Sequence, residues 1–284
     1  MNADWFAPRR WPLANGRSLI LGPSAIIMGV LNVTPDSFSD GGDFVAVDDA
    51  LARARTMMAE GATIIDIGGE STRPGAASVD GETERARVLH IIERLARDTD
   101  AIISVDTYRA ETARAAVEAG AHIVNDIWGC QREPDIARVA ADTGAGLVVM
   151  NNRRERAVDD DLIADAISFL NRTLEITDEA GVSREAVTID PGFGFSPTID
   201  HDVPILARVE KLHALGLPIL IGTSRKRFLG ALTDREAADR DVATAATSVV
   251  ARMKGAAIFR VHGIGANKDA LAVADAVIAD TIKN

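Results

Sequence analysis

A unit of one helix and one short strand recurs along the whole chain of 284 residues. In each unit a segment rich in Ala, Glu and Arg stops at a glycine, and a run of apolar residues follows within a few positions. Glycine suits that place because it adopts the left-handed backbone conformation that ends a helix. The helix-ending glycines are Gly61, Gly120, Gly144, Gly181, Gly216 and Gly255.

The recurring unit predicts eight strands that alternate with helices. The strands are expected at Ala25–Leu31, Thr63–Ile67, Ala101–Val105, His122–Asn125, Leu147–Met150, Val187–Ile189, Ile219–Ile221 and Ile258–Val261. The helices are expected at Val47–Glu60, Asp80–Arg97, Ala110–Ala119, Pro134–Asp142, Leu162–Ala180, Val203–Ala214, Asp241–Lys254 and Asn267–Ile282. Strands in such an order lie parallel with right-handed crossovers, and eight units imply an α/β fold of the closed (β/α)8 type, a TIM barrel.

A doubly wound open sheet is the alternative architecture, but no Gly-x-Gly-x-x-Gly motif follows the first strand to support it. A TIM barrel typically takes ~250 residues, so we expect residues 1–284 to form a single domain. Residues 1–23 precede the first strand. Within them Trp11 to Leu21, with the turn Asn15-Gly16, are predicted to form a β-hairpin that closes the bottom of the barrel.

Composition narrows the class of partner and the compartment. The net charge is -11 and no extended basic segment is visible, which argues against nucleic acid as a partner. Cys130 is the only cysteine, so neither an intrachain disulfide nor a cysteine zinc cluster is possible. Residues 1–17 lack the apolar core of a signal peptide, and no stretch approaches ~18 apolar residues. These features predict a cytoplasmic protein without a membrane span.

Polar residues lie at or just after the end of every predicted strand. A single Asp or Asn at such a place is more often a helix cap or a turn former than a catalytic residue. In a barrel, however, all of these strand ends meet at one face, where enzymes of this fold carry their active sites. The residues are Asn32, Asp66, Asp106, Asn125, Asp126, Asn151, Asn152, Asp190, Ser224, Arg225, Lys226, Arg260 and His262.

The mixture of these residues suggests what they bind. Aspartate and asparagine side chains suit a flat heterocycle with several ring N–H groups, because a carboxylate accepts two parallel N–H bonds. Lys226 could meet a ring carbonyl or nitrogen, or belong to a phosphate-binding patch instead. Arg260 and His262 alternate on one strand and therefore share a face. With Arg73 and Arg225 they could hold a phosphate or pyrophosphate.

The blocks that carry these residues resemble dihydropteroate synthases. They appear in that family's order and span the chain. They are Met28–Gly42, Gly68–Ala76, Ser104–Thr107, Asn125-Asp126, Asp190–Phe195, Ser224–Phe228 and Arg260-Val261-His262. The resemblance implies condensation of para-aminobenzoate with 6-hydroxymethyl-7,8-dihydropterin pyrophosphate to give 7,8-dihydropteroate and pyrophosphate, a step of folate biosynthesis. It also implies a homodimer and a target of sulfonamides.

The resemblance assigns roles to individual positions. Asp106, Asn125, Asp190 and Lys226 would bind the pterin, with Asp66 supporting them. Asn32, Arg260 and His262 would hold the pyrophosphate, with Mg²⁺ at Asn32, and Lys226, Asp106, Arg260 and His262 would act in catalysis. Two loops, Thr34–Gly42 with Asp36 and Ser71–Ala76, would close over the site. The para-aminobenzoate would be framed by Phe38, Thr72, Arg73, Pro74, Phe195 and Ser224.

Two positions depart from the family pattern and leave other readings open. Asn151 stands where the family typically has His, and Gly263 stands where it usually has Asp. Arg153, Arg154 and Arg156 are expected to be an exposed charge cluster on a loop. The alternatives are a pterin-binding paralogue with altered or lost activity, and a methyltransferase-like barrel that acts on methyltetrahydrofolate and needs no pyrophosphate site.

Overall fold

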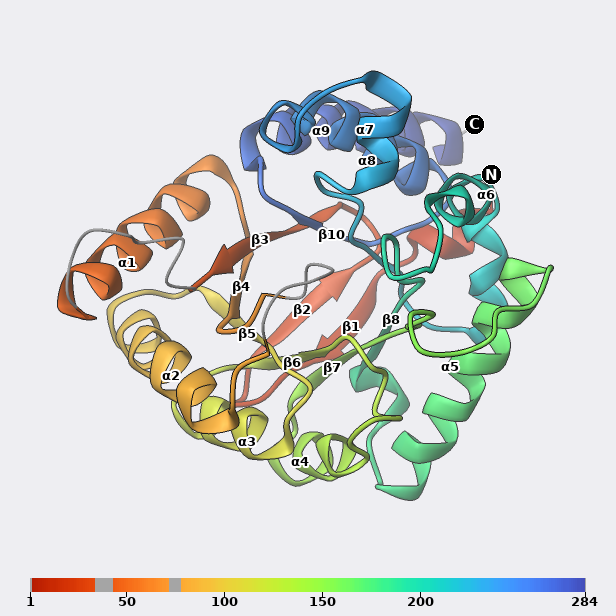
Figure 1. Ribbon diagram of the computed structural model, residues 1–284. Coiled ribbons are helices and arrows are strands. Elements are labelled where there is room, and N and C mark those ends of the chain that lie inside the picture. The colour runs from red at the N-terminus through yellow and green to blue at the C-terminus, as the bar shows by residue number, and fades with distance from the viewer. Residues whose placement is uncertain (1, 34–42, 72–77, 284) are drawn as a thin grey trace.

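The computed structural model describes residues 2–33, 43–71 and 78–283. Eight parallel strands form a barrel, and helices cover its outside (Figure 1). The strands are β3 (Ile26–Asn32), β4 (Ile64–Gly68), β5 (Ile102–Asp106), β6 (Ile123–Asp126), β7 (Gly146–Met150), β8 (Val187–Asp190), β9 (Leu220–Ile221) and β10 (Ile258–Val261). The α-helices are α1 (Asp43–Glu60), α2 (Gly81–Asp98), α3 (Ala110–Glu118), α4 (Asp135–Thr143), α5 (Leu162–Glu179), α6 (Asp202–Ala207), α7 (Arg227–Thr233), α8 (Asp241–Met253) and α9 (Ile264–Lys283).

Hydrogen bonding joins the strands in the order β8-β7-β6-β5-β4-β3-β10-β9. A further parallel bridge between Ile189 and Ile219 brings β8 next to the start of β9, which nearly closes the ring. The predicted TIM barrel is therefore confirmed, and every predicted strand lies within two residues of its observed limits. Among the described residues, no helix is long and apolar enough to cross a membrane.

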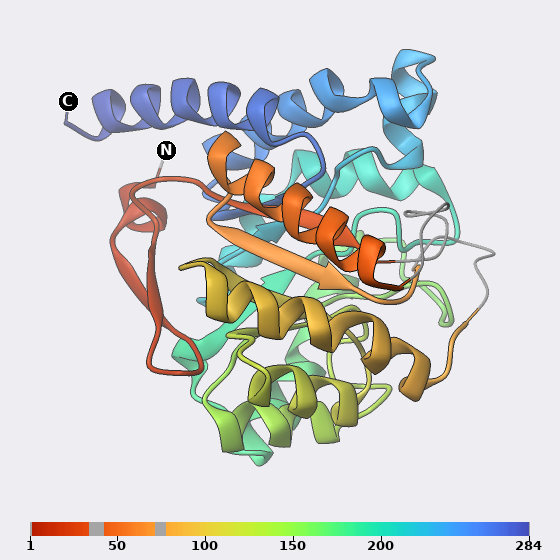
Figure 2. The same cartoon turned by 90° about the vertical axis from the view of Figure 1, so that its left-hand side faces the viewer.

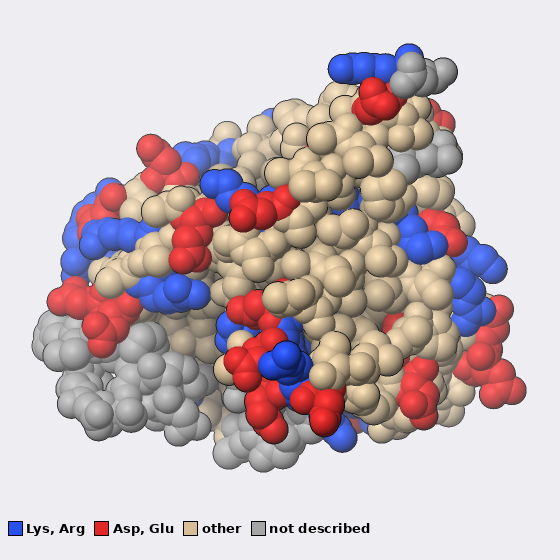
Figure 3. All heavy atoms as spheres, turned by 90° about the horizontal axis from the view of Figure 1, so that it is seen from above, with Lys and Arg blue, Asp and Glu red and all other residues tan. Residues whose placement is uncertain are grey.

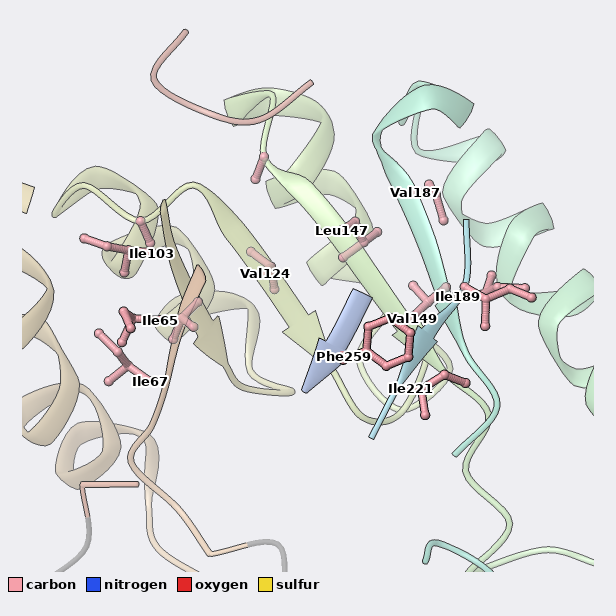
Figure 4. Close-up of a cluster of buried hydrophobic side chains, with 14 of the residues drawn as sticks. Ile65, Ile67, Ile103, Val124, Leu147, Val149, Val187, Ile189, Ile221 and Phe259 are labelled. Carbon is pink, nitrogen blue, oxygen red and sulfur yellow. The ribbon is translucent and has the colours of Figure 1, made fainter. Parts of the chain in front are cut away.

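Alternate residues of each strand point outward into a shell of apolar side chains beneath the helices. Figure 4 shows part of this shell, in which Ile65, Ile67 and Ile103 belong to neighbouring strands. The helices contribute side chains at helical spacing, as in α2, which begins after its N-cap Asp80 and buries Val88, Ile91, Ile92 and Leu95. This shell fixes the strands and leaves their other face for the barrel interior.

The interior is apolar at its lower end and is sealed by the N-terminal hairpin. Strands β1 (Arg9–Pro12) and β2 (Ser18–Leu21) pair antiparallel and lie across the end of the barrel opposite the carboxyl ends of the strands (Figure 2). The predicted hairpin is thus confirmed. Its side chains pack on the first inward layer of the strands. That cluster contains Trp11, Leu13, Leu21, Met28, Ile64, Ile102, Ile123, Val148, Leu220, Ala257 and Ile258.

Trp11→Phe is expected to lower the free energy of unfolding by about 1–2 kcal/mol without lowering the activity of the folded protein. The Trp11 side chain is fully buried, and its Nε1 donates a 2.8 Å hydrogen bond to the Ala186 carbonyl. Urea unfolding measures the loss. Trp5→Phe is the matched control, because Trp5 is half-buried and stacks on His213. A fall in activity per folded molecule would contradict the prediction that packing at the hairpin end of the barrel does not affect the active site.

Two local predictions were wrong. The helix expected at Val203–Ala214 is instead α6 followed by a 3₁₀-helix at Val209–Leu215. The break falls at Arg208, whose φ of -128° and ψ of 17° leave the helical region. The second error is α7, a seven-residue helix that was not expected. It begins directly after Lys226, so the lysine stands at a fixed helix start rather than in a loop.

Candidate active site

Two residues above the apolar floor, the same inward positions of four strands become polar. Asp66 follows Ile64, Ser104 follows Ile102, Asn125 follows Ile123 and Arg260 follows Ile258, each by two residues along its strand. Because alternate residues of a strand share a face, the floor residues direct these side chains inward as well. The register brings Asp66 beside Ser104 and Asp106 beside Asn125. The structure thus gathers three of the predicted pterin residues, Asp66, Asp106 and Asn125, into one layer.

Arg260 is the centre of this layer. Its Nε donates to Asp66 Oδ2 and its Nη2 donates to Asp106 Oδ2, both at 2.6 Å. Asn125 Nδ2 also donates to Asp66 Oδ2, at 3.3 Å. The Asp66 side chain is fully buried and its Oδ1 has no protein partner among the described residues. A buried carboxylate oxygen of this kind can accept a hydrogen bond from a ligand or water.

The charges of the layer are strongly coupled. Burial raises the pKa of Asp106 to about 7 and the charge of Asp66 adds to this, although Arg260 acts in the opposite direction. Burial lowers the pKa of Arg260, but Asp66 and Asp106 outweigh it and hold that pKa above its usual value. The guanidinium therefore stays charged, and Asp106 changes its protonation near neutral pH.

Asp190 and Lys226 form the adjoining part of the site. Asp190 Oδ1 accepts a 2.7 Å hydrogen bond from the Gly192 N–H, and burial raises its pKa to about 6. Burial lowers the pKa of Lys226 to about 8, with Arg260 adding to the effect. The Lys226 Nζ lies 4.4 Å from the centre of the Phe195 ring, within the range of a cation–π contact. Ring and lysine thus border the same space.

Asn32, His262 and Ser224 line a cleft that also contains Lys226 and Arg260. The cleft has a volume of about 940 Å³. Ser224 Oγ lies 3.0 Å from His262 Nδ1 and accepts a 3.1 Å hydrogen bond from the His262 backbone N–H. Burial and the charge of Arg260 lower the pKa of His262 to about 3, so the imidazole is neutral at pH 7. Ser224 thereby holds the imidazole at the wall of the cleft.

Arg225 forms an ion pair with a carboxylate of the protein, whereas a phosphate was the expected partner. Its Nε and Nη2 each donate to the Asp241 carboxylate at 2.8 Å, in a bidentate pair. Asp241 also explains the departure at Gly263, since a Cβ there would lie about 2.5 Å from the Asp241 carboxylate. A carboxylate is therefore present beside residue 263, but it comes from α8. This pair could not be predicted because sequence spacing does not indicate which helix faces the strand end.

The arginines that follow β7 are not the exposed cluster that was expected. Arg153 is fully buried, with its Nη1 donating to the Pro191 carbonyl at 2.9 Å and its Nε to Asp165 at 3.3 Å. Arg156 makes two 2.6 Å hydrogen bonds to Asp165 and one of 2.9 Å to Asn151 Oδ1. Asp165 on α5 binds both arginines, so Arg153 is fully buried and Arg156 is only 28% exposed.

This segment also holds the loop after β8. The Asn151 N–H donates to the Asp190 carbonyl and the Arg153 N–H to the Phe195 carbonyl, both at 2.9 Å. Gly192, at φ +80°, brings the two chains so close that a Cβ would collide with the Asn151 carbonyl oxygen. Asp202, another residue missed in the sequence, accepts a 2.9 Å hydrogen bond from the Gly194 N–H. Asp190 and Phe195 are thereby fixed from both sides.

Five of the predicted site residues lie outside the described residues. They are Asp36, Phe38, Thr72, Arg73 and Pro74. The structure brings the others to one face of the barrel, at the carboxyl ends of the strands. They are Asn32, Asp66, Asp106, Asn125, Asp190, Phe195, Ser224, Lys226, Arg260 and His262. Their individual roles stay predictions.

Comparison with known proteins finds one family over most of the chain. Residues 28–262 match the family described as pterin binding enzyme. The chain is 46% identical to dihydropteroate synthase of Bacillus subtilis (strain 168) over 239 residues, 84% of each sequence. It is 44% identical to that of Streptococcus pyogenes serotype M3 over 260 residues, 91% of this chain and 97% of the relative.

Solved structures of dihydropteroate synthases are also similar to this protein. The Xanthomonas albilineans dihydropteroate synthase with 4-aminobenzoic acid has a TM-score of 0.89 and 41% identity, covering 95% of this chain and 99% of that one. The Clostridium difficile enzyme, solved in the presence of pteroic acid, has a TM-score of 0.88 and 40% identity, covering 90% and 98%. Fold and site therefore define a pterin-binding enzyme built on a TIM barrel. Within that class, the chain belongs to the dihydropteroate synthase family, and it is a transferase of folate biosynthesis.

We expect kcat/KM for the pterin substrate to be bell-shaped in pH, with its maximum between about pH 7 and 8. On the acid side Asp106 and Asp190, with pKa values of about 7 and 6, take up protons, lose their negative charge and can no longer accept two parallel N–H bonds. On the basic side Lys226, with a pKa of about 8, loses its charge. Lys226→Arg should move only the basic limb upward. A constant value from pH 6 to 9 would contradict this prediction.

Proposed function

We propose that the polar layer of this barrel binds 6-hydroxymethyl-7,8-dihydropterin pyrophosphate and transfers its pterin-methyl group to para-aminobenzoate, giving 7,8-dihydropteroate and pyrophosphate. The observation that carries the proposal is the meeting of Asp106, Asp190, Lys226 and Arg260 in and beside one buried layer. Buried, hydrogen-bonding carboxylates next to two cations suit a ring system with N–H groups on one edge and an anionic tail.

The pterin is assigned to the inner part of the cleft. Asp190 would accept N–H bonds from its amino-pyrimidine edge, and Asp106 and Asn125 would bind the opposite side of the ring. Lys226 would meet the ring carbonyl or nitrogen. Asp66 supports this arrangement, because it shares Arg260 with Asp106 and accepts a hydrogen bond from Asn125.

The pyrophosphate is assigned to Asn32, Arg260 and His262. Neutral His262 would donate a hydrogen bond from Nε2, while Arg260 supplies a permanent charge. Mg²⁺ prefers oxygen ligands and usually keeps several waters, so the Asn32 amide oxygen together with the pyrophosphate fits its needs. Among the described residues no three His, Cys, Asp or Glu side chains are grouped to hold a metal. A metal bound here would neutralise charge on the leaving pyrophosphate.

The chemistry then depends on positioning. Negative charge develops on the bridging oxygen as pyrophosphate leaves, and Arg260 and His262 stabilise it where it forms. The electron-rich pterin can stabilise a cationic methylene, so departure can precede attack by the amine. We therefore assign no general base. Phe195 and Lys226 would orient the aminobenzoate ring against that methylene.

Pyrophosphate release tests the proposal. The protein is mixed with the pterin pyrophosphate, para-aminobenzoate and Mg²⁺, and released pyrophosphate is measured. We expect release that stops with EDTA and returns when Mg²⁺ is added in excess. No release at any Mg²⁺ concentration would overturn the proposal. Transfer of a methyl group from methyltetrahydrofolate would instead support the methyltransferase alternative. That reaction involves no pyrophosphate, so it would give no role to the set formed by Asn32, Arg260 and His262.

Assembly, location and domain organisation stay predictions. We propose that residues 1–284 act as one domain and that two copies form a homodimer in the cytoplasm. The face that carries α8 and α9 supports the dimer, because its central part has few charged side chains (Figure 3). Exposed apolar residues on these helices include Val242, Val250, Val273 and Val277, with exposed fractions of 80%, 43%, 66% and 47%.

A further inference from the structure

The turn that follows β8 carries Asp190, and Arg153 contacts this turn at two points. The Arg153 backbone N–H donates to the Phe195 carbonyl, and its Nη1 donates to the Pro191 carbonyl, both at 2.9 Å. Between these two points the Gly192 N–H donates to Asp190 Oδ1 at 2.7 Å. Arg153 therefore spans the piece of chain that sets the direction of the Asp190 carboxylate.

Helix α5 fixes Arg153 in its turn. The Arg153 side chain is fully buried, and its Nε donates to Asp165 at 3.3 Å. Asp165 is 3% exposed and lies in the first turn of α5, where Asp161 caps the helix. A regular helix thus holds the Asp165 carboxylate, the carboxylate holds the guanidinium, and the guanidinium holds the turn after β8.

Stability alone does not account for a buried arginine at this place. Burial lowers the pKa of Arg153, and its Nη2 has no protein partner among the described residues. Apolar side chains of similar volume often replace a buried ion pair without loss of stability. Beside Asp165, α5 buries Leu162, Ile163 and Ala166, so an apolar pair would suit these surroundings. The charge and the directed hydrogen bonds of Arg153 therefore indicate a task at the turn.

Arg153 also acts on the charge of Asp190. Burial raises the pKa of Asp190 to about 6, and the Gly192 N–H and the cations Lys226, Arg260 and Arg153 oppose that rise. Lys226 and Arg260 line the cleft, whereas Arg153 does not and acts from the end of β7. The carboxylates near these three cations are Asp66 and Asp106 beside Arg260, Asp165 beside Arg153, and Asp202 beside Lys226 and Arg153.

We infer that Arg153, anchored by Asp165, is a positioning residue for the pterin substrate, because it keeps the Asp190 carboxylate in the place and the charge state that the amino-pyrimidine edge requires. The inference rests on the proposed function, which assigns that edge to Asp190. Arg153 does not line the cleft, so its effect on the substrate passes through Asp190.

Arg153→Met tests the positioning role, because methionine fills much of the space without the charge or the donors. KM for the pterin pyrophosphate should rise about 10-fold or more, while KM for para-aminobenzoate stays the same. Arg153→Lys keeps the charge but loses the planar set of donors, so it should restore part of the loss. Thermal unfolding verifies that both variants are folded. Equal rises in the two KM values, or none in either variant, would overturn the inference.

The titration of Asp190 is a second readout that needs no substrate. NMR of protein with isotope-labelled aspartate carboxyl groups follows it, and the signal missing from Asp190→Asn identifies Asp190. Loss of a nearby cation disfavours the carboxylate, so the pKa of Asp190 should rise above about 6 in Arg153→Met and return toward that value in Arg153→Lys. An unchanged pKa in Arg153→Met would contradict the inference. Should that variant fail to fold, KM in Arg153→Lys decides.

Arg156→Met is the matched control. Arg156 donates to the same Asp165 at 2.6 Å, but among the described residues it has no hydrogen bond to residues 190–195. Its loss should lower stability and leave both KM for the pterin pyrophosphate and the pKa of Asp190 unchanged. Effects equal to those of Arg153→Met would overturn the inference alone. An unaltered protein that releases no pyrophosphate would overturn the proposed function, whereas the titration of Asp190 would still test the action of Arg153 on Asp190.

Discussion

Asp190→Ala is expected to weaken binding of the pterin pyrophosphate about 100-fold or more, a cost of about 3 kcal/mol. Asp190 is 6% exposed and uses Oδ1 for the Gly192 N–H. Its carboxylate would accept the N–H groups of the pterin edge. Removing it leaves those donors buried without partners, which costs their full desolvation. Titration calorimetry with the pterin pyrophosphate measures the loss.

Asp126→Ala is the control for this prediction. Asp126 is also a buried strand-end aspartate, and burial raises its pKa to about 6 as well. Its oxygens, however, accept the N–H groups of Trp128 and Cys130 at 2.8 and 2.6 Å and shape the loop after β6. We expect Asp126→Ala to lower stability and to leave pterin affinity near normal in the folded fraction. Near-normal affinity in Asp190→Ala would refute the assignment of the pterin edge.

Arg260→Met is expected to lower the free energy of unfolding by about 3–5 kcal/mol at pH 8 and to abolish most activity. The substitution leaves Asp66 and Asp106 facing each other without their shared cation. At pH 5 the loss should be smaller, because Asp106, with a pKa of about 7 that rises further without Arg260, is then protonated. Affinity should fall more for the pterin pyrophosphate than for the free pterin.

The control for Arg260→Met is Arg252→Met. Arg252 is fully buried, whereas the Arg260 side chain is 19% exposed. Arg252 is paired with Asp275 at 2.6 Å and donates to the Gly22 and Ala256 carbonyls at the other end of the barrel. Its loss should destabilise the fold and leave the ratio of the two affinities unchanged. Chemical unfolding at both pH values and calorimetry with both ligands give the comparison. Equal losses of the two affinities in Arg260→Met would argue against a pyrophosphate role for Arg260.

Stability and activity should respond to pH in opposite directions near the acid limb. The pKa of Asp106 is raised from 3.8 to about 7, so the folded protein holds a proton that the unfolded chain has already released. This contribution to stability is complete below about pH 4 and is lost as the pH rises to about 7. The carboxylate that binding needs is therefore formed at the expense of stability.

The strands and the positions of the polar residues could be predicted because both depend on local pattern. A buried parallel strand is an apolar run, and the change from Ile64 to Asp66 or from Ile102 to Ser104 marks where the interior becomes polar. The glycines that end the helices mark the place in each repeat where the helix stops and the next strand follows. Which strands neighbour one another then follows from topology, so residues far apart in sequence could be placed at one face.

Partner choice could not be predicted in the same way. Arg260 binds Asp66 and Asp106, which are 194 and 154 residues away. Arg225 binds Asp241 and Arg153 is buried against Asp165, at separations of 16 and 12 residues, but in each case the partner lies on a different element. These pairs depend on side-chain directions and on which helix covers which strand end. Sequence alone shows an arginine after a strand, so we expected a phosphate beside Arg225 and Arg260 and solvent around Arg153.

The closed lower end of the barrel also restricts the order in which substrates can bind and the product can leave. Below the polar layer the barrel is filled by a cluster of apolar side chains that includes Trp11 and Ile258. A ligand of the polar layer therefore has to enter through the cleft. A second molecule seated against Phe195 would stand in that path. Under the proposed function, the heterocycle would then enter first, and the joined product would withdraw with its benzoate end leading. The packed Trp11 at the far end of the barrel would thereby set the order of these steps.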